Sequence, residues 1–229
     1  MAIKATELAG IIAKNSLLAS CETDELEELL ARARLLAMKK GETLLNQGDD
    51  GDSLIILLEG TVRISMATSN GREIVLNYAD AGEVLGEIAL LDGEPRTASA
   101  TTVTEGKYLR ISRSAFESTV QRYPGLGLRL LRQMAKRQRQ TNSMIENDRA
   151  FTSGPRLARY IQRLMLEPTH DRLRLNLSQS ELGNFAGISR EHINRQLSSW
   201  ADSGIIALEN GRIRVTDYAI LSRIAASTE

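Results

Sequence analysis

Residues 125–147 read GLGLRLLRQMAKRQRQTNSMIEN, a run that follows Pro124 and contains no further proline. Proline suits the first turn of a helix, because the N–H that it lacks has no partner there. Side chains recur along the run at alternating spacings of four and three, the repeat of a coiled-coil seam. The seam positions are Gly127, Leu131, Met134, Gln138, Thr141 and Ile145. The run predicts one long helix that pairs through this seam with a second copy of the chain.

Most of the remaining surface of this helix is Arg, Lys, Gln or Asn, which is too polar for a helix inside a core. The seam itself turns polar at Gln138, Thr141 and the neighbouring Asn142. Polar groups in a seam cost stability unless they form specific hydrogen bonds, so we expect a specific partner for them. The alternative is a helix that packs on its own domain and exposes a solvated outer face.

At 229 residues the chain suggests one large domain or two ordinary ones. The whole chain is formally neutral, but residues 1–128 carry a net charge of −6, residues 129–149 carry +4 and residues 150–229 carry +2. All the basic residues of the last segment are Arg, which suits planar, bidentate recognition. The second half is therefore the part expected to meet an anionic partner.

Cys21 is the single cysteine, so neither an internal disulfide nor a cysteine-ligated iron–sulfur cluster is expected. No apolar run is long enough to span a membrane, and the apolar stretch that a lipoprotein signal would need before Cys21 is interrupted by charges. No nucleophile–base pair or metal cluster stands out. We expect a cytoplasmic protein that is not an enzyme, has no metal and makes no membrane contact.

Glycines separate short apolar or alternating runs over residues 42–111, after two helices predicted at residues 3–13 and 24–34, the second capped by Thr23. Short strands with regular turn signals are typical of a compact antiparallel barrel or roll. Asn70-Gly71 is a strong hairpin signal between two of them. The predicted strands cover residues 54–58, 62–66, 73–78, 97–102 and 107–111.

Residues 86–98, GEIALLDGEPRTA, have the pattern of an anion-binding turn. Gly86 lets a ligand approach the backbone, and the residues after it can form a short helix whose free N–H groups face an anion. Arg96 and Thr97, at the start of the next strand, would add a guanidinium and a hydroxyl, whereas the Glu87 carboxylate suits a hydroxyl such as that of a ribose. The alternative is a glycine-rich turn with a surface Glu–Arg pair. The candidate ligand-binding residues here are Gly86, Glu87, Ile88, Ala89, Arg96 and Thr97.

A helix capped by Ser114 and Glu117 is expected to precede the long helix, and residues 151–155, FTSGP, break the helical pattern after it. The next helix contains Leu157 and Ile161 on its inner face, and residues 173–177 alternate as a strand. These signals place a domain boundary near residues 151–155.

Residues 178–203 predict a helix-turn-helix followed by a hairpin wing at 205–215. A capping box at Ser178–Glu181 opens the first helix, Gly187 turns the chain and Ser189 caps the second helix. In the second helix Ile193, Leu197 and Trp200 share one face and the polar residues share the other. The N-terminal end of such a helix enters the major groove of DNA, where Arg reads guanine and Glu reads cytosine. The alternative is an ordinary solvated face. The candidate DNA-binding residues are Ser178, Gln179, Ser189, Arg190, Glu191, Asn194 and Arg195.

The order of roll, long helix and winged helix-turn-helix resembles the Crp/Fnr family of bacterial transcription regulators across essentially the whole chain. The resemblance implies an α+β fold in three parts: a cyclic-nucleotide-binding, jelly-roll-like β-roll at residues 1–123, a dimerisation helix at 124–150, and a winged helix-turn-helix at 151–229. In the cyclic-nucleotide-binding members, residues matching Glu87 take the ribose hydroxyl, and those matching Arg96 and Thr97 take the cyclic phosphate.

The same resemblance implies a homodimer that binds double-stranded DNA at a TGTGA-like palindrome, works with RNA polymerase and is controlled allosterically by cAMP, with cGMP as the competing ligand. Thr141 and Asn142 match a Thr-Ser pair that meets the purine in those members. The amide of Asn142 both donates and accepts hydrogen bonds, so it suits guanine as well as adenine. The alternative is a regulator of the same fold that is constitutive or senses a different small effector.

Overall fold

The computed structural model divides into two compact units, Met1–Gln140 and Thr141–Glu229, which are described separately. It describes residues 3–13, 16–69, 71, 73–150, 152–165, 182, 188–209 and 212–227, without the side chains of 140, 143–150, 163, 190 and 212.

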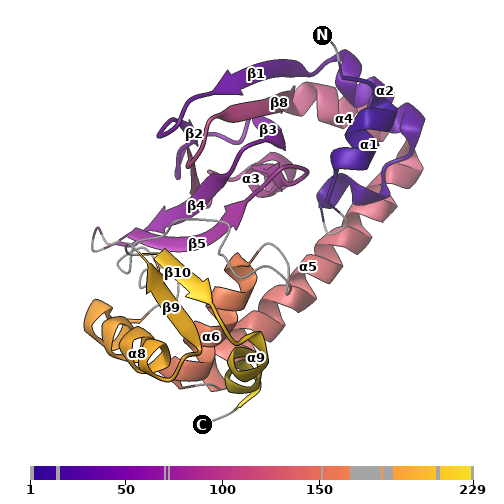
Figure 1. The fold of residues 1–229 in the computed structure, drawn as a ribbon. Coiled ribbons are helices and arrows are strands. Elements are labelled where there is room, and N and C mark those ends of the chain that lie inside the picture. The colour runs from indigo at the N-terminus through magenta and orange to yellow at the C-terminus, as the bar shows by residue number, and fades with distance from the viewer. Residues whose placement is uncertain are drawn as a thin grey trace. The chain divides into compact units, whose positions relative to one another are not determined.

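Two four-stranded sheets form the first unit (Figure 1). The first sheet has the order β1 (Arg34–Met38), β8 (Gly106–Ser112), β3 (Ser53–Glu59) and β6 (Val84–Leu85). The second has the order β2 (Thr43–Leu45), β7 (Ser99–Thr102), β4 (Val62–Ala67) and β5 (Glu73–Ala79). Every strand pairing in the described part of this unit is antiparallel, which confirms the predicted roll.

Two predicted boundaries are wrong. Strand β1 occupies residues that the sequence assigned partly to a helix ending at residue 34, and Arg96 and Thr97 lie in the loop before β7 rather than in the strand. Glycine and proline separate Arg96 from α3, so the backbone must turn before the strand can pair.

Helices cover the outer face of the first sheet: α1 (Ala5–Ile11), the 3-10 helix η1 (Leu17–Ser20), α2 (Thr23–Ala31) and α4 (Arg113–Arg122). The cap of α2 is Glu22, whose N–H donates to Glu25 Oε2 at 2.9 Å, and not Thr23 as predicted. The cap of α4 is Ser112, which accepts from the N–H of Ala115, and not Ser114. In both cases the strand or turn before the helix leaves the capping residue extended, which the local pattern could not show.

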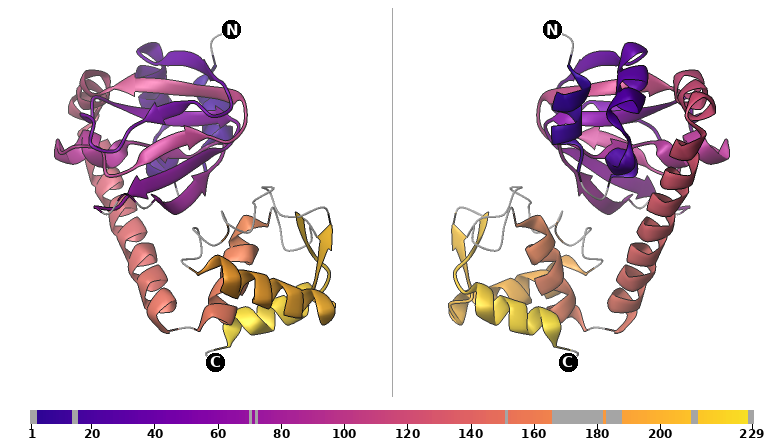
Figure 2. Two further views of the ribbon diagram at one scale, coloured as in Figure 1. Left: turned by 90° about the vertical axis from the view of Figure 1, so that its left-hand side faces the viewer. Right: turned by 90° about the vertical axis from the view of Figure 1, so that its right-hand side faces the viewer.

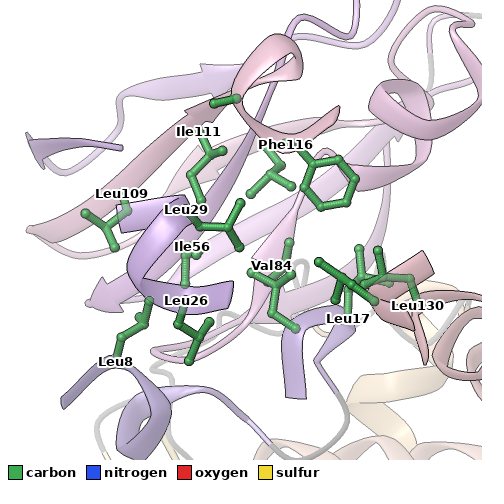
Figure 3. Close-up of a cluster of buried hydrophobic side chains, with 14 of the residues drawn as sticks. Leu8, Leu17, Leu26, Leu29, Ile56, Val84, Leu109, Ile111, Phe116 and Leu130 are labelled. Carbon is green, nitrogen blue, oxygen red and sulfur yellow. The ribbon is translucent and has the colours of Figure 1, made fainter. Parts of the chain in front are cut away.

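Strand β3 is buried on both faces, because Ile55 and Leu57 point into the roll while Leu54 and Ile56 face the helices. Leu54 and Ile56 belong to the buried cluster between the sheet and the helices that Figure 3 shows. In it, side chains of α2, β3, β8 and α4 meet those of the long helix. Burying a large aliphatic side chain contributes about 1.5–3 kcal/mol, so this cluster fastens the helices to the roll.

The long helix α5 (Pro124–Ala150) begins at Pro124, as predicted. One stripe of it, Leu126, Leu130 and Gln133, is buried against its own unit. The predicted seam lies on another face, where Leu131 is 67 % exposed. The helix packs on its own domain, as in the alternative, and also presents a separate apolar stripe; pairing of this stripe with a second copy stays a prediction.

Beside that stripe lies an apolar groove of about 420 Å³. It is lined by side chains of α3 (Glu87–Asp92), α4 and α5. Leu90, Phe116, Leu130, Leu131 and Met134 are among the lining residues.

The second unit contains α6 (Ser153–Leu164), α8 (Arg190–Asp202) and α9 (Tyr218–Ala226), with a hairpin of β9 (Ile206–Glu209) and β10 (Arg212–Val215) (Figure 2). Ile193, Leu197 and Trp200 of α8 are buried, as predicted, and Ser189 caps this helix. Helix α9, capped by Asp217, was not predicted. The predicted strand at 173–177, the capping box at Ser178–Glu181 and the turn around Gly187 lie outside the described residues, as does Asn70.

Candidate functional site

The turn between β6 and α3 requires glycine at position 86. Gly86 has φ +80°, a left-handed conformation that side chains with a Cβ rarely adopt. A Cβ at this position would lie 2.5 Å from Nη1 of Arg96 and 3.0 Å from Cδ1 of Leu45. The missing side chain therefore makes room for the guanidinium.

Arg96 is a buried cation, with only 4 % of its surface exposed. Its Nη1 donates to the carbonyl oxygen of Gly86 at 2.6 Å, and its Nη2 donates to that of Ser53 at 2.6 Å. The second nitrogen also lies 3.4 Å from Oδ1 of Asp52. These partners hold the guanidinium against the turn that leads into α3.

The electrostatic surroundings of Arg96 contain both carboxylates and guanidinium groups. Burial lowers the pKa of the Arg96 guanidinium, Arg110 and Arg113 lower it further, and Asp52 is the main opposing influence. Asp52 is 72 % exposed in its side chain, so water screens it. Glu87 also raises the pKa of Arg96, so the arginines stand opposite two carboxylates, of which Asp52 is the exposed one.

Glu87, the first residue of α3, is buried, and its Oε1 accepts from Nη1 of Arg137 on α5. The sequence pointed to Arg96 as the cation beside Glu87 and missed Arg137. Arg137 continues the spacing of Leu126, Leu130 and Gln133 on one face of the helix, and this spacing was the signal in the sequence that could have identified it. This ion pair joins the turn at Gly86 to the long helix.

The other predicted ligand residues are placed less centrally. Ala89 is buried against Gly51, Ile88 is partly exposed, and Thr97 is exposed in the loop next to Arg96. Thr141 and Asn142 are exposed residues of α5 and belong to the second unit. The structure thus brings together Gly86, Glu87 and Arg96 within the first unit.

A pocket of about 270 Å³ lies beside Arg96. Its lining combines two guanidinium groups, those of Arg96 and Arg110, with the carboxylates of Asp49, Asp50 and Asp52. The sequence had not singled out these aspartates, which follow Gly48 in an otherwise ordinary turn. The pocket suits a small polar ligand that offers an anion to the arginines and hydroxyl groups to the carboxylates.

The exposed face of α8 is the candidate DNA-binding surface. Ser189, Glu191 and Arg195 are exposed there. Nη2 of Arg195 lies 3.2 Å from Nδ1 of His192, whose Nε2 is 3.0 Å from the hydroxyl of Ser153 on α6.

Asn194 is half-buried, and its Oδ1 is buried without a partner among the described residues. It lies one residue after buried Ile193, so it sits at the border between the two faces. The backbone of Arg190 begins the helix, whereas its side chain, Ser178 and Gln179 lie outside the described residues.

None of the helices in the described part of the chain combines the length and apolar character that crossing a bilayer requires. The residues that the structure describes hold no group of three or more His, Cys, Asp or Glu side chains placed to bind a metal ion.

Residues 35–123 match the model of the cyclic nucleotide-binding domain, and residues 155–224 match that of the Crp-like helix-turn-helix domain. A curated relative, the CRP-like cAMP-activated global transcriptional regulator of Mycobacterium tuberculosis, is 31 % identical over 226 residues, covering 94 % of this chain and 98 % of the relative. The chain belongs to the Crp/Fnr family of transcription regulators.

Solved structures agree with this assignment. A CRP family transcriptional regulator from Thermus thermophilus matches with a TM-score of 0.68 and 26 % identity, covering 85 % of this chain and 98 % of that one. The c-di-GMP responsive regulator CLP of Xanthomonas campestris matches with a TM-score of 0.72 and 22 % identity, covering 85 % and 99 %, which shows a shared fold. This Crp/Fnr protein is thus a DNA-binding regulator with a cyclic nucleotide-binding domain, in a family of transcription regulators rather than enzymes.

Proposed function

We propose that this regulator is a homodimer whose affinity for a TGTGA-like palindrome is controlled by cAMP, with cGMP as the competing ligand. The observation that carries the proposal is the buried cation Arg96 beside the left-handed turn at Gly86, within a cyclic nucleotide-binding domain. The M. tuberculosis relative is described as cAMP-activated, which supports the choice of cAMP. We retain the predicted division into a sensor domain at 1–123, a dimerisation helix at 124–150 and a DNA-binding domain at 151–229.

In this proposal the cyclic phosphate binds Arg96 and Thr97, and the ribose hydroxyl binds Glu87. A singly charged phosphate can replace the exposed Asp52 carboxylate as the partner of Arg96, since both present oxygen acceptors to a guanidinium. Backbone N–H groups of Ile88 and Ala89, in the first turn of α3, add donors to the phosphate. Thr141 and Asn142 would contact the purine.

Dimerisation is supported by the exposed stripe of α5. Leu131 is 67 % exposed, and the groove beside it is almost wholly apolar. A second copy of α5 would cover this stripe, because a seam repeating at four and three residues matches itself across a two-fold axis. RNA polymerase is the further partner that we propose for the DNA-bound dimer.

On DNA, we propose that Arg190, Glu191 and Arg195 read bases in the major groove, one recognition helix per half-site. Half-sites separated by one turn, about 34 Å, then fit a two-fold dimer. Ser178, Gln179, Ser189 and Asn194 would complete the interface through backbone or base contacts. Residues 150–229 carry a net charge of +2 and their basic residues are all Arg, which supports this placement.

Fluorescence anisotropy of a labelled palindromic duplex, at fixed salt, tests the proposal with no ligand, with cAMP and with cGMP. Salt must be constant because phosphate contacts make DNA affinity strongly salt-dependent. We expect cAMP to tighten binding, and Arg96→Leu to abolish this response while leaving ligand-free DNA affinity unchanged. Tight binding of the duplex that neither nucleotide alters would refute cyclic nucleotide control.

A second candidate is a regulator of the same fold that is constitutive or senses another effector. It is favoured by one observation: Arg96 and Glu87 already have protein partners in Gly86, Ser53 and Arg137. A ligand must compete with these contacts. The c-di-GMP responsive neighbour of the same fold illustrates that effectors differ. Full DNA affinity without any nucleotide would support this candidate.

A further inference from the structure

Arg113, the first residue of α4, binds three backbone carbonyl groups with one guanidinium. Its Nη1 donates to the oxygen of Leu90 at 2.6 Å. Its Nη2 donates to the oxygens of Ala89 at 2.9 Å and of Gly51 at 2.7 Å. Two of these acceptors belong to α3, the helix that begins at Glu87, and the third belongs to the loop before β3.

The acceptors explain why an arginine fits this position. The last carbonyl groups of a helix keep free acceptor capacity, and a cation there is also favoured by the helix dipole; the oxygen of Ala89 also accepts from the N–H of Gly93 at 3.1 Å. A Cβ on Gly51 would lie 2.5 Å from the backbone of Ala89, so loop and helix are in direct contact. The planar fork of Arg reaches acceptors on both, which the single ammonium of Lys cannot reproduce.

The loop before β3 also binds the backbone of Arg113 and the guanidinium of Arg96. The N–H of Arg113 donates to the carbonyl oxygen of Asp52 at 2.7 Å. The carboxylate of Asp52 and the carbonyl oxygen of Ser53 both bind the Arg96 guanidinium. Residues 51–53 are therefore shared between the cation of the proposed phosphate site and the first residue of α4.

We propose that Arg113 is a positioning residue that transmits ligand binding at α3 and Arg96 to α4 and α5. The inference rests on the proposed function, because it needs a ligand at that site. When an anion draws Arg96 or the start of α3 toward itself, the carbonyl groups of α3 and of residues 51–53 move, and Arg113 carries α4 with them. Phe116 of α4 packs in one cluster with Leu126 and Leu130 of α5, so the movement continues into the long helix.

The two possible roles of Arg113, a cap that only stabilises α3 and a residue that couples the site to α4, lead to different expected results. If Arg113 only stabilised α3, its loss would lower thermal stability and nucleotide affinity together. If Arg113 couples the site to α4, its loss should largely keep the nucleotide affinity. The gain in DNA affinity that nucleotide binding causes should be lost, because the nucleotide site is then no longer coupled to DNA binding.

The experiment compares wild type, Arg113→Gln, Arg113→Lys and the matched control Arg122→Gln. Arg122 lies at the other end of α4, is 65 % exposed and pairs with Glu28 at 2.8 Å, away from α3. Calorimetry measures the affinity for cAMP and for cGMP. Anisotropy measures the ratio of DNA affinities with and without nucleotide. Hydrogen exchange reports on the amides of residues 87–92 and 113–122.

We expect Arg113→Gln to bind nucleotide within about threefold of wild type and to lose about tenfold or more of the ligand-induced gain in DNA affinity, within the usual range of allosteric coupling. Nucleotide should protect amides of both segments in wild type and Arg122→Gln but only residues 87–92 in Arg113→Gln, with Arg113→Lys intermediate. A full DNA response in Arg113→Gln, or a loss of nucleotide affinity that parallels a lower melting temperature, overturns the inference alone. Wild-type protein that binds neither nucleotide refutes the proposed function as well.

Discussion

Two neighbouring leucines of α5, Leu130 and Leu131, should affect different properties when changed to alanine. The first change should lower the stability of the protomer, and the second should weaken the proposed dimer. Leu130 is buried in the core of its own unit, whereas Leu131 is 67 % exposed and lies on the proposed dimer seam. Successive residues of a helix are separated by about 100° around its axis, so adjacent positions can serve different surfaces. Leu and Ala have similar helix propensities, so neither change should weaken the helix itself.

The magnitudes follow from burial. Covering a leucine completely is worth about 1.5–3 kcal/mol, so covering the exposed two-thirds of Leu131 is worth about 1–2 kcal/mol per protomer and about 2–4 kcal/mol per dimer. At about 1.4 kcal/mol per factor of ten, Leu131→Ala should raise the dimer Kd about 30- to 700-fold. Leu130→Ala leaves a cavity and should lower the free energy of unfolding by about 2–5 kcal/mol.

Sedimentation velocity over a dilution series gives the dimer Kd, and urea unfolding extrapolated to low protein concentration gives the stability without the contribution of association. Leu128→Ala, at a neighbouring exposed position off the seam, is the matched control and should change the Kd less than Leu131→Ala. A dimer Kd that Leu131→Ala leaves unchanged would refute the assignment of the seam. So would Leu131→Ala unfolding as easily as Leu130→Ala.

Gly86→Ala should lose nucleotide binding with little change in DNA affinity, because φ +80° and a Cβ 2.5 Å from Arg96 force the turn and the guanidinium apart; calorimetry with retained cAMP affinity would contradict this. Cys21 should resist alkylation in the folded protein. Burial, reinforced by Glu25, raises its pKa from 9.0 to about 12, so the thiolate fraction at pH 8 falls about a thousandfold. Iodoacetamide should therefore modify the native protein far more slowly than the protein unfolded in urea, and equal rates would show that the thiol is not shielded. Since the folded state keeps this proton above pH 9 while the unfolded state loses it, the Cys21 contribution to stability should decline as the pH rises from 9 to about 12.

Local signals determined a large part of this protein. The seam spacing and Pro124 located the long helix, Ser189 located the cap of α8, and the positive φ of Gly86 matches a position where glycine was singled out from the pattern. Each of these depends on residues within one or two turns of one another, so the sequence carries the information directly.

Contacts between distant segments were decided by the tertiary structure alone. Arg137 meets Glu87, Arg96 meets Ser53, and Arg113 meets Gly51, pairs separated by 50, 43 and 62 residues. A charged side chain has the same local pattern whether it faces water or a buried acceptor, so its partner cannot be read from its neighbours. Strand β1 was missed for a related reason, since an exposed edge strand acquires its conformation from hydrogen bonds to β8 rather than from its own propensity. The sequence could name the types of groups in the site, but only the packing of sheet, α3 and α5 decided which of them meet.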